Sequence, residues 1–216
     1  HLRFEPVKNL GRMDKSEKQQ ALVVMVKNPV AGKVKTRLAA SVGDEKALTV
    51  YKALLAHTAS VAAATNAVRY IFYSDLIERN DTFSDTDFRK YVQCDGDLGV
   101  RMDYAVSIPF KNEFKKVVII GADCPSLSAA HIQQAFDALD SHDFVIGPAT
   151  DGGYYLLGMK KWNRWVFASM PWSSPELLAA TQALFESKGV AWKALPELTD
   201  IDTLEDLQHS NLSAII

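Results

Sequence analysis

Residues 117–125 read Val-Val-Ile-Ile-Gly-Ala-Asp-Cys-Pro, a continuous apolar run that ends in small residues and one carboxylate. An unbroken run of β-branched residues is typical of a strand that is buried on both faces of a mostly parallel sheet. Other short runs rich in Val and Ile alternate with helical patterns along the chain. The sequence therefore predicts an α/β fold with three layers, α/β/α, around a mostly parallel, mixed sheet.

Seven segments are predicted as strands, because they are short, apolar and bounded by turn residues. They are residues 21–27, 68–74, 90–94, 117–121, 144–148, 154–159 and 190–195. Apolar residues recur at helical spacing over residues 44–64, 128–139 and 175–187, which are predicted as helices. For the last helix we expect a capping box of Ser173 and Glu176, with Pro175 in the first turn.

Length and composition favour a single domain. The chain has 216 residues, 48% of them hydrophobic, which is enough for one sizeable core but hardly for two. We expect the domain to span residues 21–216. Residues 1–20 are charged and irregular, so we expect a segment that is flexible or was introduced during cloning, and it carries no part of the functional argument.

Charge and cysteine content narrow the function classes. A formal net charge of -2 gives no long-range attraction to nucleic acid or to anionic membranes, so we expect neither as a partner. No apolar run approaches the length of a membrane helix, and the N-terminal residues lack the apolar stretch of a secretory signal. Two cysteines, Cys94 and Cys124, lie far apart in the sequence. We expect a soluble, cytoplasmic protein, and the sequence leaves homo-oligomerisation open.

The loop after the first predicted strand is rich in cations. It reads Lys-Asn-Pro-Val-Ala-Gly-Lys-Val-Lys-Thr-Arg-Leu over residues 27–38. Gly32 lets the backbone approach a ligand, and Lys35 and Arg37 share one side of an extended loop, where they can clamp phosphate oxygens. The loop departs from the P-loop pattern at Lys27 and Val34. A phosphate-binding loop and a solvated basic turn before a helix are the two interpretations.

A second loop, residues 93–102, reads Gln-Cys-Asp-Gly-Asp-Leu-Gly-Val-Arg-Met and opens a helix. Two glycines at a helix N-terminus are compatible with an anion or ribose site. The alternative is a simple turn in which Asp97 caps the helix.

Carboxylates follow two predicted buried segments. In an open α/β sheet, ligands bind beyond the carboxyl ends of the strands, where Asp123 is expected. Mg²⁺ and Mn²⁺ prefer oxygen ligands and are held by one or two carboxylates with phosphates and water, so Asp123 is a candidate metal ligand. Asp200 and Asp202 share one side of an extended segment and offer a second carboxylate. The alternatives are that Asp123 caps the turn before Pro125, and that Asp202 or Thr203 only caps a helix.

A fourth loop reads Asp-Gly-Gly-Tyr-Tyr from residue 151. It is either a tight turn between two strands or a ligand-binding turn. In the second case Gly152 and Gly153 bring backbone amides to a ligand, and Asp151 faces a sugar, a metal or an acceptor proton. Trp162, Trp165 and Trp172 either shape an acceptor pocket or bury an apolar lid.

Taken together, these motifs resemble a known family. Lys-x-Pro-x-x-Gly-x-x-Lys-Thr-Arg-Leu, Gly-Asp-Leu-Gly-x-Arg-Met, Gly-x-Asp-Cys-Pro, Asp-Gly-Gly-Tyr-Tyr-Leu and Asp-Ile-Asp-Thr occur in this order over residues 21–207. The set looks like that of the bacterial radical-SAM/selenodomain-associated glycosyltransferase-like proteins. Those proteins are similar in fold to molybdenum-cofactor guanylyltransferase, 2-phospholactate guanylyltransferase and the cytidylyltransferase of isoprenoid synthesis. The resemblance implies a nucleotide-diphospho-sugar transferase fold of the GT-A, Rossmann-like type.

The resemblance also implies roles for residues. Lys35 and Arg37 fall where the relatives hold a nucleoside triphosphate, although Asn-Pro-Val-Ala-Gly replaces their usual Gly-x-Gly-x-Arg loop, which leaves the donor nucleotide open. The predicted nucleotide- or phosphate-binding residues are Lys27, Gly32, Lys35, Arg37, Gln93, Gly96, Asp97, Gly99, Arg101, Gly152 and Gly153. The candidate catalytic residues are Lys35, Arg37 and Asp151. The predicted metal ligands are Asp123, Asp200 and Asp202, for Mg²⁺ or Mn²⁺.

These expectations describe a metal-dependent transferase that uses a nucleotide or nucleotide sugar and an unidentified small-molecule acceptor. In nucleotidyl transfer an acceptor phosphate attacks the α-phosphorus, and cations neutralise the departing pyrophosphate. In glycosyl transfer a nucleoside diphosphate departs, and Asp151 acts as the base. The alternative is a non-catalytic nucleotide-binding regulatory protein of the same fold.

Overall fold

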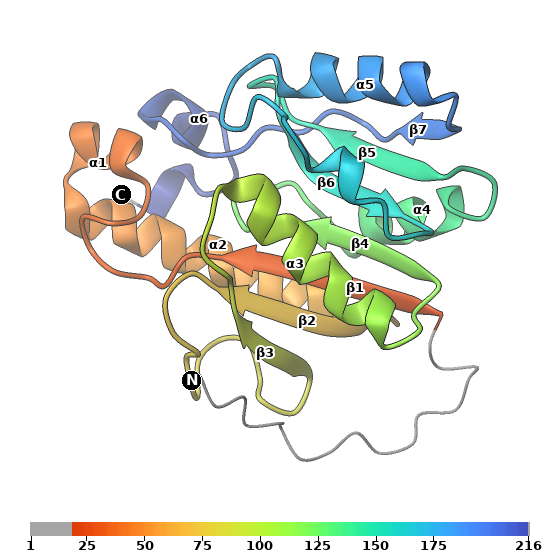
Figure 1. The fold of residues 1–216 in the computed structure, drawn as a ribbon. Helices are drawn as coiled ribbons and strands as arrows, with labels where there is room; N and C mark the ends of the chain where they lie inside the picture. The colour runs from red at the N-terminus through yellow and green to blue at the C-terminus, as the bar shows by residue number, and fades with distance from the viewer. Residues whose placement is uncertain (1–18, 216) are drawn as a thin grey trace.

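The computed structural model describes residues 19–215, and seven strands form one mixed sheet in this part of the chain. The strands are β1 (Gln20–Val26), β2 (Val68–Tyr73), β3 (Phe88–Val92), β4 (Lys116–Ile120), β5 (Phe144–Pro148), β6 (Tyr154–Met159) and β7 (Trp192–Ala194). Their order in the sheet is β3-β2-β1-β4-β6-β5-β7. β6 runs antiparallel to both of its neighbours, and the other adjacent pairs are parallel. The predicted α/β fold with a mostly parallel, mixed sheet is confirmed (Figure 1).

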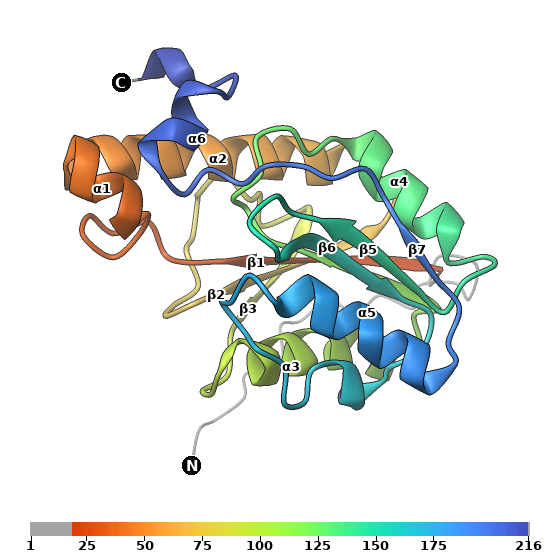
Figure 2. The same ribbon diagram turned by 90° about the horizontal axis from the view of Figure 1, so that it is seen from above.

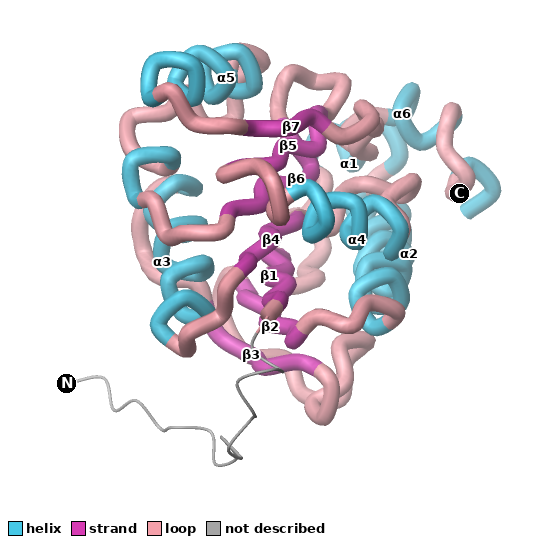
Figure 3. The backbone as a smooth tube through the Cα atoms, turned by 90° about the vertical axis from the view of Figure 1, so that its right-hand side faces the viewer, coloured by secondary structure: helices cyan, strands magenta, loops and turns pink. Residues whose placement is uncertain are grey.

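Helices cover both faces of the sheet. They are α1 (Thr36–Val42), α2 (Asp44–Ala63), α3 (Leu98–Lys111), α4 (Ala129–Ala138), α5 (Leu177–Lys188) and α6 (Leu204–Gln208), with short 3-10 turns η1 (Arg164–Val166) and η2 (Ser213–Ile215). Figures 2 and 3 show α2 and α4 on one face, and α3 and α5 on the other. The three layers that the alternation of strands and helices predicts are therefore present.

The core is split by the sheet, because successive residues of a strand point to opposite faces. In β1, Leu22 and Val24 pack toward α2 and α4, whereas Ala21 and Val23 pack toward α3 and α5. β4 divides in the same way, with all its residues after Lys116 buried. A third, smaller cluster joins α1, α2 and α6. It fixes the two charged segments, residues 27–37 and 200–202, beside one end of the sheet.

Two details differ from the sequence expectations. The third strand spans Phe88–Val92, whereas residues 90–94 were predicted, because the charged side chain of Arg89 obscured its start. Lys90, the first residue of the predicted strand, is buried in the middle of β3, and its Nζ lies 2.8 Å from Asp81 Oδ1. The predicted capping box is wrong. α5 begins at Leu177, Ser173 has a positive φ of 60°, and the hydroxyl of Ser174 contacts the Glu176 carboxylate instead.

The predicted N-terminal segment, residues 1–20, lies almost entirely outside the described residues, and Gln20 already belongs to β1. Among residues 19–215, none of the helices has the length and the apolar character needed to cross a membrane.

Candidate active site at the carboxyl ends of β1 and β4

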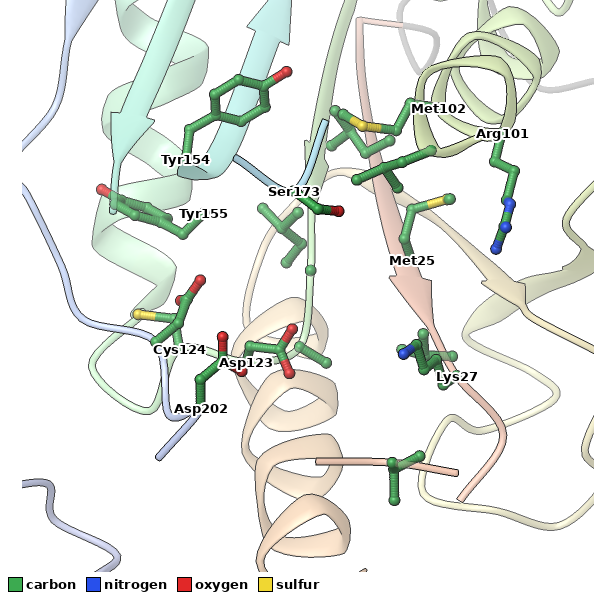
Figure 4. Close-up of a pocket in the computed structure, with 18 of the residues that line it drawn as sticks. Met25, Lys27, Arg101, Met102, Asp123, Cys124, Tyr154, Tyr155, Ser173 and Asp202 are labelled. Carbon is green, nitrogen blue, oxygen red and sulfur yellow. The ribbon is translucent and has the colours of Figure 1, made fainter. Parts of the chain in front are cut away.

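A cavity of about 470 Å³ opens where the direction of strand order reverses. From β1 the chain proceeds to β2 and β3 on one side, and β4 then pairs with the other side of β1. At such a switch point the connections after neighbouring strands diverge and leave a crevice, which is where open α/β sheets bind ligands. Figure 4 shows side chains around this space from β1, α3, β6, the segment after β4 and the C-terminal segment.

Lys35 and two carboxylates form the charged centre of the cavity. Lys35 Nζ lies 2.5 Å from Asp123 Oδ1 and 3.1 Å from Asp202 Oδ1. The Lys35 side chain is 5% exposed, whereas those of Asp123 and Asp202 are 46% and 40% exposed and face the cavity. Burial by itself lowers the pKa of Lys35, but the charges of Asp123 and Asp202 outweigh it, so the pKa is raised and the amine stays protonated.

Local backbone contacts bring these three residues together. Lys35 immediately precedes α1 with a left-handed φ of 48°. The N–H of Ile201 donates to the carbonyl of Asp123 at 2.9 Å, which ties the C-terminal segment to the end of β4. Thr203, rather than Asp202, caps α6, since its Oγ1 accepts a hydrogen bond from the N–H of Asp206. The Asp202 carboxylate is thereby left to face Lys35.

Further cations surround this centre. Arg37 Nη1 lies 3.9 Å from Asp202 Oδ2, and the side chain is largely exposed. Lys27 lines the cavity from the loop directly after β1, and Arg101 lines it from α3. The backbone of Lys27 is fixed by Tyr51, whose hydroxyl accepts from the N–H of Lys27 at 2.9 Å and donates to its carbonyl at 3.1 Å. An anionic ligand would therefore meet cationic side chains on several sides.

Asp200 is the most unusual carboxylate of the cavity. Burial, followed by the charge of Asp123, raises its pKa to about 7. Within residues 19–215, two buried side-chain polar atoms have no hydrogen-bond partner, Asp200 Oδ1 and Tyr154 Oη, and both residues line this cavity. An unpaired buried polar group costs about 1–3 kcal/mol, so these two atoms are candidate hydrogen-bond partners for a polar group that enters the cavity.

The carboxylates fit a divalent cation. No group of three or more His, Cys, Asp or Glu side chains within residues 19–215 is arranged to hold a metal ion. Mg²⁺, however, is usually bound by one or two carboxylates, with waters and phosphates completing its shell. Asp123 and Asp202 supply two exposed carboxylates that face the same space, and Asp200 has an unpaired oxygen beside them. This donor set of hard oxygen atoms suits Mg²⁺ or Mn²⁺.

In the Gly-Asp-Leu-Gly motif, Leu98 lines the cavity and the other three residues lie outside its lining. Asp97 caps α3, with its Oδ1 accepting from the N–H of Val100 at 2.9 Å. A Cβ added at Gly99 would lie 2.4 Å from the carbonyl oxygen of Phe167 and from Nε1 of Trp172. Gly96, Asp97 and Gly99 do not line the cavity, whereas Gln93 and Arg101 on either side of them do. Gln93 Nε2 also donates to the carbonyls of Val26 and Phe72, each at 3.0 Å, which joins the ends of β1 and β2.

The Asp-Gly-Gly turn contacts the segment at residues 167–175, which Gly99 also contacts, from another side. Gly152 has a φ of 87°, and an added Cβ would lie 2.1 Å from the carbonyl oxygen of Pro175. Asp151 is exposed, and its Oδ1 accepts from the N–H of Gly153 at 2.9 Å. None of these three residues lines the cavity, nor does Gly32 in the first loop. Gly99 and Gly152 thus hold residues 167–175, which we call the wall segment because Trp172 and Ser173 line the cavity.

Several cavity residues were not expected from the sequence. Tyr51, Tyr154 and Tyr155 line the cavity, as do Met25 and Met102. Met25 and Tyr154 lie in strands that the sequence predicts, but only strand register identifies which of their residues face the cavity. Of the three tryptophans considered, Trp172 lines the cavity; Trp165 packs against Phe144 and Phe185, and Trp162 Nε1 donates to Asp103 Oδ1. Cys124 is buried, and burial raises the pKa of its thiol to about 12.

The fold is that of nucleotide-diphospho-sugar transferase-like proteins, with a charged crevice at the switch point of the sheet. The chain belongs to the family described as uncharacterized protein conserved in bacteria (DUF2064), whose model matches residues 56–174. That range includes Asp123, both glycine motifs and Trp172, and excludes the two charged segments at residues 27–37 and 200–202. No curated protein matches the chain.

Solved structures share the whole fold. A provisionally assigned nucleotide-diphospho-sugar transferase from Desulfovibrio desulfuricans G20 has a TM-score of 0.81 and 28% identity, over 91% of this chain and 93% of that one. The 4-diphosphocytidyl-2C-methyl-D-erythritol synthase of Anaerococcus prevotii DSM 20548 has a TM-score of 0.57 and 13% identity, over 92% and 97%. CMP:2-keto-3-deoxy-manno-octonic acid synthetase, determined in complex with CTP, has a TM-score of 0.55 and 11% identity, over 88% and 95%.

Proposed function

We propose that this chain is a metal-dependent transferase that binds the phosphates of a nucleotide donor at Lys35 and Arg37 and transfers the nucleotidyl group to an acceptor phosphate. The observation that carries the proposal is the charged centre: Lys35 between Asp123 and Asp202 at the carboxyl ends of β1 and β4. Cations for phosphate and carboxylates for a divalent ion meet there in one cavity. The similarity to the Desulfovibrio desulfuricans protein supports a transferase of this class.

Each group of the cavity has a part in this chemistry. Lys35, Arg37 and Lys27 would bind the triphosphate and neutralise the charge that builds on the leaving pyrophosphate. An acceptor phosphate oxygen attacks the α-phosphorus, and the bond from that phosphorus to the bridging oxygen of pyrophosphate breaks. Mg²⁺ or Mn²⁺, held by Asp123 and Asp202 with Asp200 beside them, would supply further neutralisation of phosphate charge.

Nucleotidyl transfer is favoured over glycosyl transfer because it needs no protein base. A phosphate acceptor is already a nucleophile at neutral pH, whereas a sugar hydroxyl must lose a proton. Asp151, the expected base, is exposed, bonded to the N–H of Gly153, and outside the lining of the cavity. Glycosyl transfer remains the second candidate, because the Desulfovibrio desulfuricans protein is assigned as a nucleotide-diphospho-sugar transferase.

Two finer assignments belong to the same proposal. Kinship with the radical-SAM/selenodomain-associated glycosyltransferase-like proteins is supported by the order of the motifs along the chain. A cytoplasmic location is supported by the two free cysteines, Cys94 and Cys124, since exported proteins commonly pair theirs.

Product analysis tests the proposal. The purified protein is incubated with Mn²⁺ or Mg²⁺, each common nucleoside triphosphate or nucleotide sugar, and a panel of sugar phosphates and other phosphomonoesters. We expect release of pyrophosphate from one triphosphate, and a loss of at least about tenfold in rate for Arg37→Met. Lys33→Met, an exposed lysine of the same loop that does not line the cavity, is the matched control.

The products separate the candidates. Release of nucleoside diphosphate from a nucleotide sugar would replace nucleotidyl with glycosyl transfer. Tight nucleotide binding without either product would favour the non-catalytic regulatory protein, and absence of nucleotide binding would exclude all three.

A further inference from the structure

Lys35 occupies the space that a metal bound by Asp123 and Asp202 would have to share. Its Nζ is within 3.1 Å of an oxygen of each carboxylate. In this cavity the cation and the carboxylates already satisfy each other.

The contact is built into the fold. Val34 is buried directly before Lys35, and Leu38, in the first turn of α1, packs in the cluster that includes Ile201. The carbonyl of Lys35 accepts the N–H of Ala39 at 2.8 Å, and the Lys35 side chain is almost fully buried. Because core packing and backbone hydrogen bonds fix both segments, the lysine is held between the carboxylates instead of sampling solvent.

Charge then dictates how ligands enter. A divalent cation that arrives alone must compete with an ammonium group already paired with both carboxylates. A polyphosphate that arrives alone must draw Lys35 away from Asp123 and Asp202, and it then faces two unpaired negative charges. When both arrive together the partners exchange: the metal takes the carboxylates, and Lys35 takes the phosphate.

We propose that Lys35 is an internal counter-ion that keeps the Asp123–Asp202 pair closed to metal until phosphate draws the lysine away, so that metal and nucleotide bind with positive coupling. This inference rests on the proposed function. It adds that the free protein binds divalent ions weakly, and that the species it takes up is the metal–nucleotide complex. Coupling free energies of this kind correspond to about 5- to 150-fold changes in affinity, and the change is reciprocal for the two ligands.

Neutral variants of Lys35 test the proposal without any activity assay. The probe is Mn²⁺, titrated by calorimetry into nucleotide-free wild type, Lys35→Met and Lys35→Gln. Methionine suits the buried position, and glutamine can still donate to a carboxylate, so the second variant decides the result if the first does not fold. We expect both folded variants to bind Mn²⁺ at least about fivefold more tightly than wild type.

Controls locate the effect. Lys33→Met removes the same charge from the same loop at an exposed position, and its Mn²⁺ affinity should match wild type. Adding Asp202→Asn to Lys35→Gln should abolish the gain, because one of the two carboxylates is lost. In the second arm, the complex of Mn²⁺ with the nucleoside triphosphate should bind the Lys35 variants more weakly than wild type.

We therefore expect the Lys35 variants to bind Mn²⁺ alone more tightly than wild type, and to bind the complex of Mn²⁺ with the nucleotide more weakly. If Lys35 were only a phosphate ligand, the nucleotide complex would bind more weakly but Mn²⁺ alone would bind as in wild type, and this outcome overturns the inference while leaving the proposed function intact. If wild type bound no nucleotide in the presence of Mn²⁺, the proposed function would fail and the inference would fail with it.

Discussion

The two charged segments and the two glycine motifs serve the same cavity in different ways. Residues 27–37 and 200–202 place Lys35 and Asp202 inside it, together with Asp123. The glycines of the motifs at residues 96–99 and 151–153 lie outside the cavity lining, and Gly99 and Gly152 contact the wall segment, residues 167–175, from two sides. The first pair supplies charge to a ligand, and the second pair shapes the space that the ligand enters.

A glycine motif that follows a strand can serve packing within the protein. A glycine permits close approach of any group, and in this structure the approaching groups are the backbone of Phe167 and Pro175 and the indole of Trp172. Substitutions in the glycine motifs should therefore act first on stability. Substitutions in the charged segments should act first on ligand affinity.

The largest effect is expected for Gly152→Ala. Alanine would have to adopt a φ of 87° and would bring Cβ to 2.1 Å from the carbonyl oxygen of Pro175, so the turn or the wall segment must shift. Left-handed strain and overpacking together should lower the free energy of unfolding by about 3 kcal/mol. Denaturant titration measures this change.

Gly153→Ala is the matched control for this substitution. Its φ is not in the left-handed region, and the atom nearest to an added Cβ, at 3.2 Å, belongs to the Asp151 side chain, which can move. We expect a change within about 1 kcal/mol. A Gly152→Ala protein that kept its stability but lost nucleotide binding would contradict the assignment of this motif to stability, since it would indicate that the motif contacts the ligand.

Asp123→Asn should have the next largest effect, and it should act mainly on ligand affinity. It keeps the shape of the side chain but removes one carboxylate of the candidate metal pair. We expect the affinity for the Mn²⁺–nucleotide complex to fall at least about tenfold, since the loss of partners even one shell further out costs about 10- to 100-fold. The buried Lys35 then keeps only Asp202 as a charged partner, so we also expect a loss of stability, smaller than that of Gly152→Ala. Calorimetry and thermal unfolding give the two values.

Asp95→Asn provides the control for this change, because Asp95 is an exposed carboxylate near the cavity that does not line it. Equal losses of affinity in the two variants would mean that general negative charge, rather than Asp123, governs binding.

The sequence predicted the architecture well because the pattern of apolar runs is decided locally. Residues 144–148 and 154–159 were predicted to the residue, and the strand before Asp123 to within one residue. The predicted start of a strand was displaced where a tertiary contact allows a charged residue to be buried. Lys90 looks like a polar strand boundary but is a buried residue of β3, because Asp81 neutralises it.

The site was harder to predict, for two physical reasons. Motif spacing identified Lys35, Asp123 and Asp202 as candidates, but it did not show that the lysine lies between the carboxylates, because this contact joins residues 167 positions apart. The side-chain direction of Tyr154 follows from its register in β6. The packing partners of Gly99 and Gly152 belong to the wall segment, whose irregular backbone has no periodic pattern to read.

Asp200→Asn should produce a smaller change, and it tests one residue of the charged segment at residues 200–202. Burial raises the pKa of Asp200 to about 7, so above that pH the folded protein holds a buried charge that the unfolded chain exposes to water. Asparagine removes this charge, and we expect the metal-free protein to gain about 1 kcal/mol of stability at pH 8. The gain should shrink toward pH 5, where the native carboxyl is already neutral.

Thermal unfolding at both pH values, with a chelator present, tests the sign. A loss of stability at pH 8 would show that Asp200 has a partner in the folded protein. Nucleotide binding in the same variant separates its two effects: a stabilised protein with weaker binding is expected for a residue that serves the ligand at the expense of the fold.

The smallest effect is expected for Tyr154→Phe. This substitution tests whether β6 contacts the ligand, as the charged segments do, or only shapes the cavity, as the glycine motifs do. The Tyr154 hydroxyl is buried without a partner, so its loss should not lower stability. If a ligand accepts or donates a hydrogen bond there, affinity should fall by about threefold to tenfold, equivalent to about 0.7–1.4 kcal/mol. Tyr155→Phe is the control, because its hydroxyl donates to the carbonyl of Pro196 at 3.0 Å. That variant should lose stability and keep its affinity for ligand. Weaker ligand binding in Tyr154→Phe, with lower stability but unchanged binding in Tyr155→Phe, would show that the Tyr154 hydroxyl contacts the ligand. Unchanged affinity in both variants would show that Tyr154 only packs around the cavity.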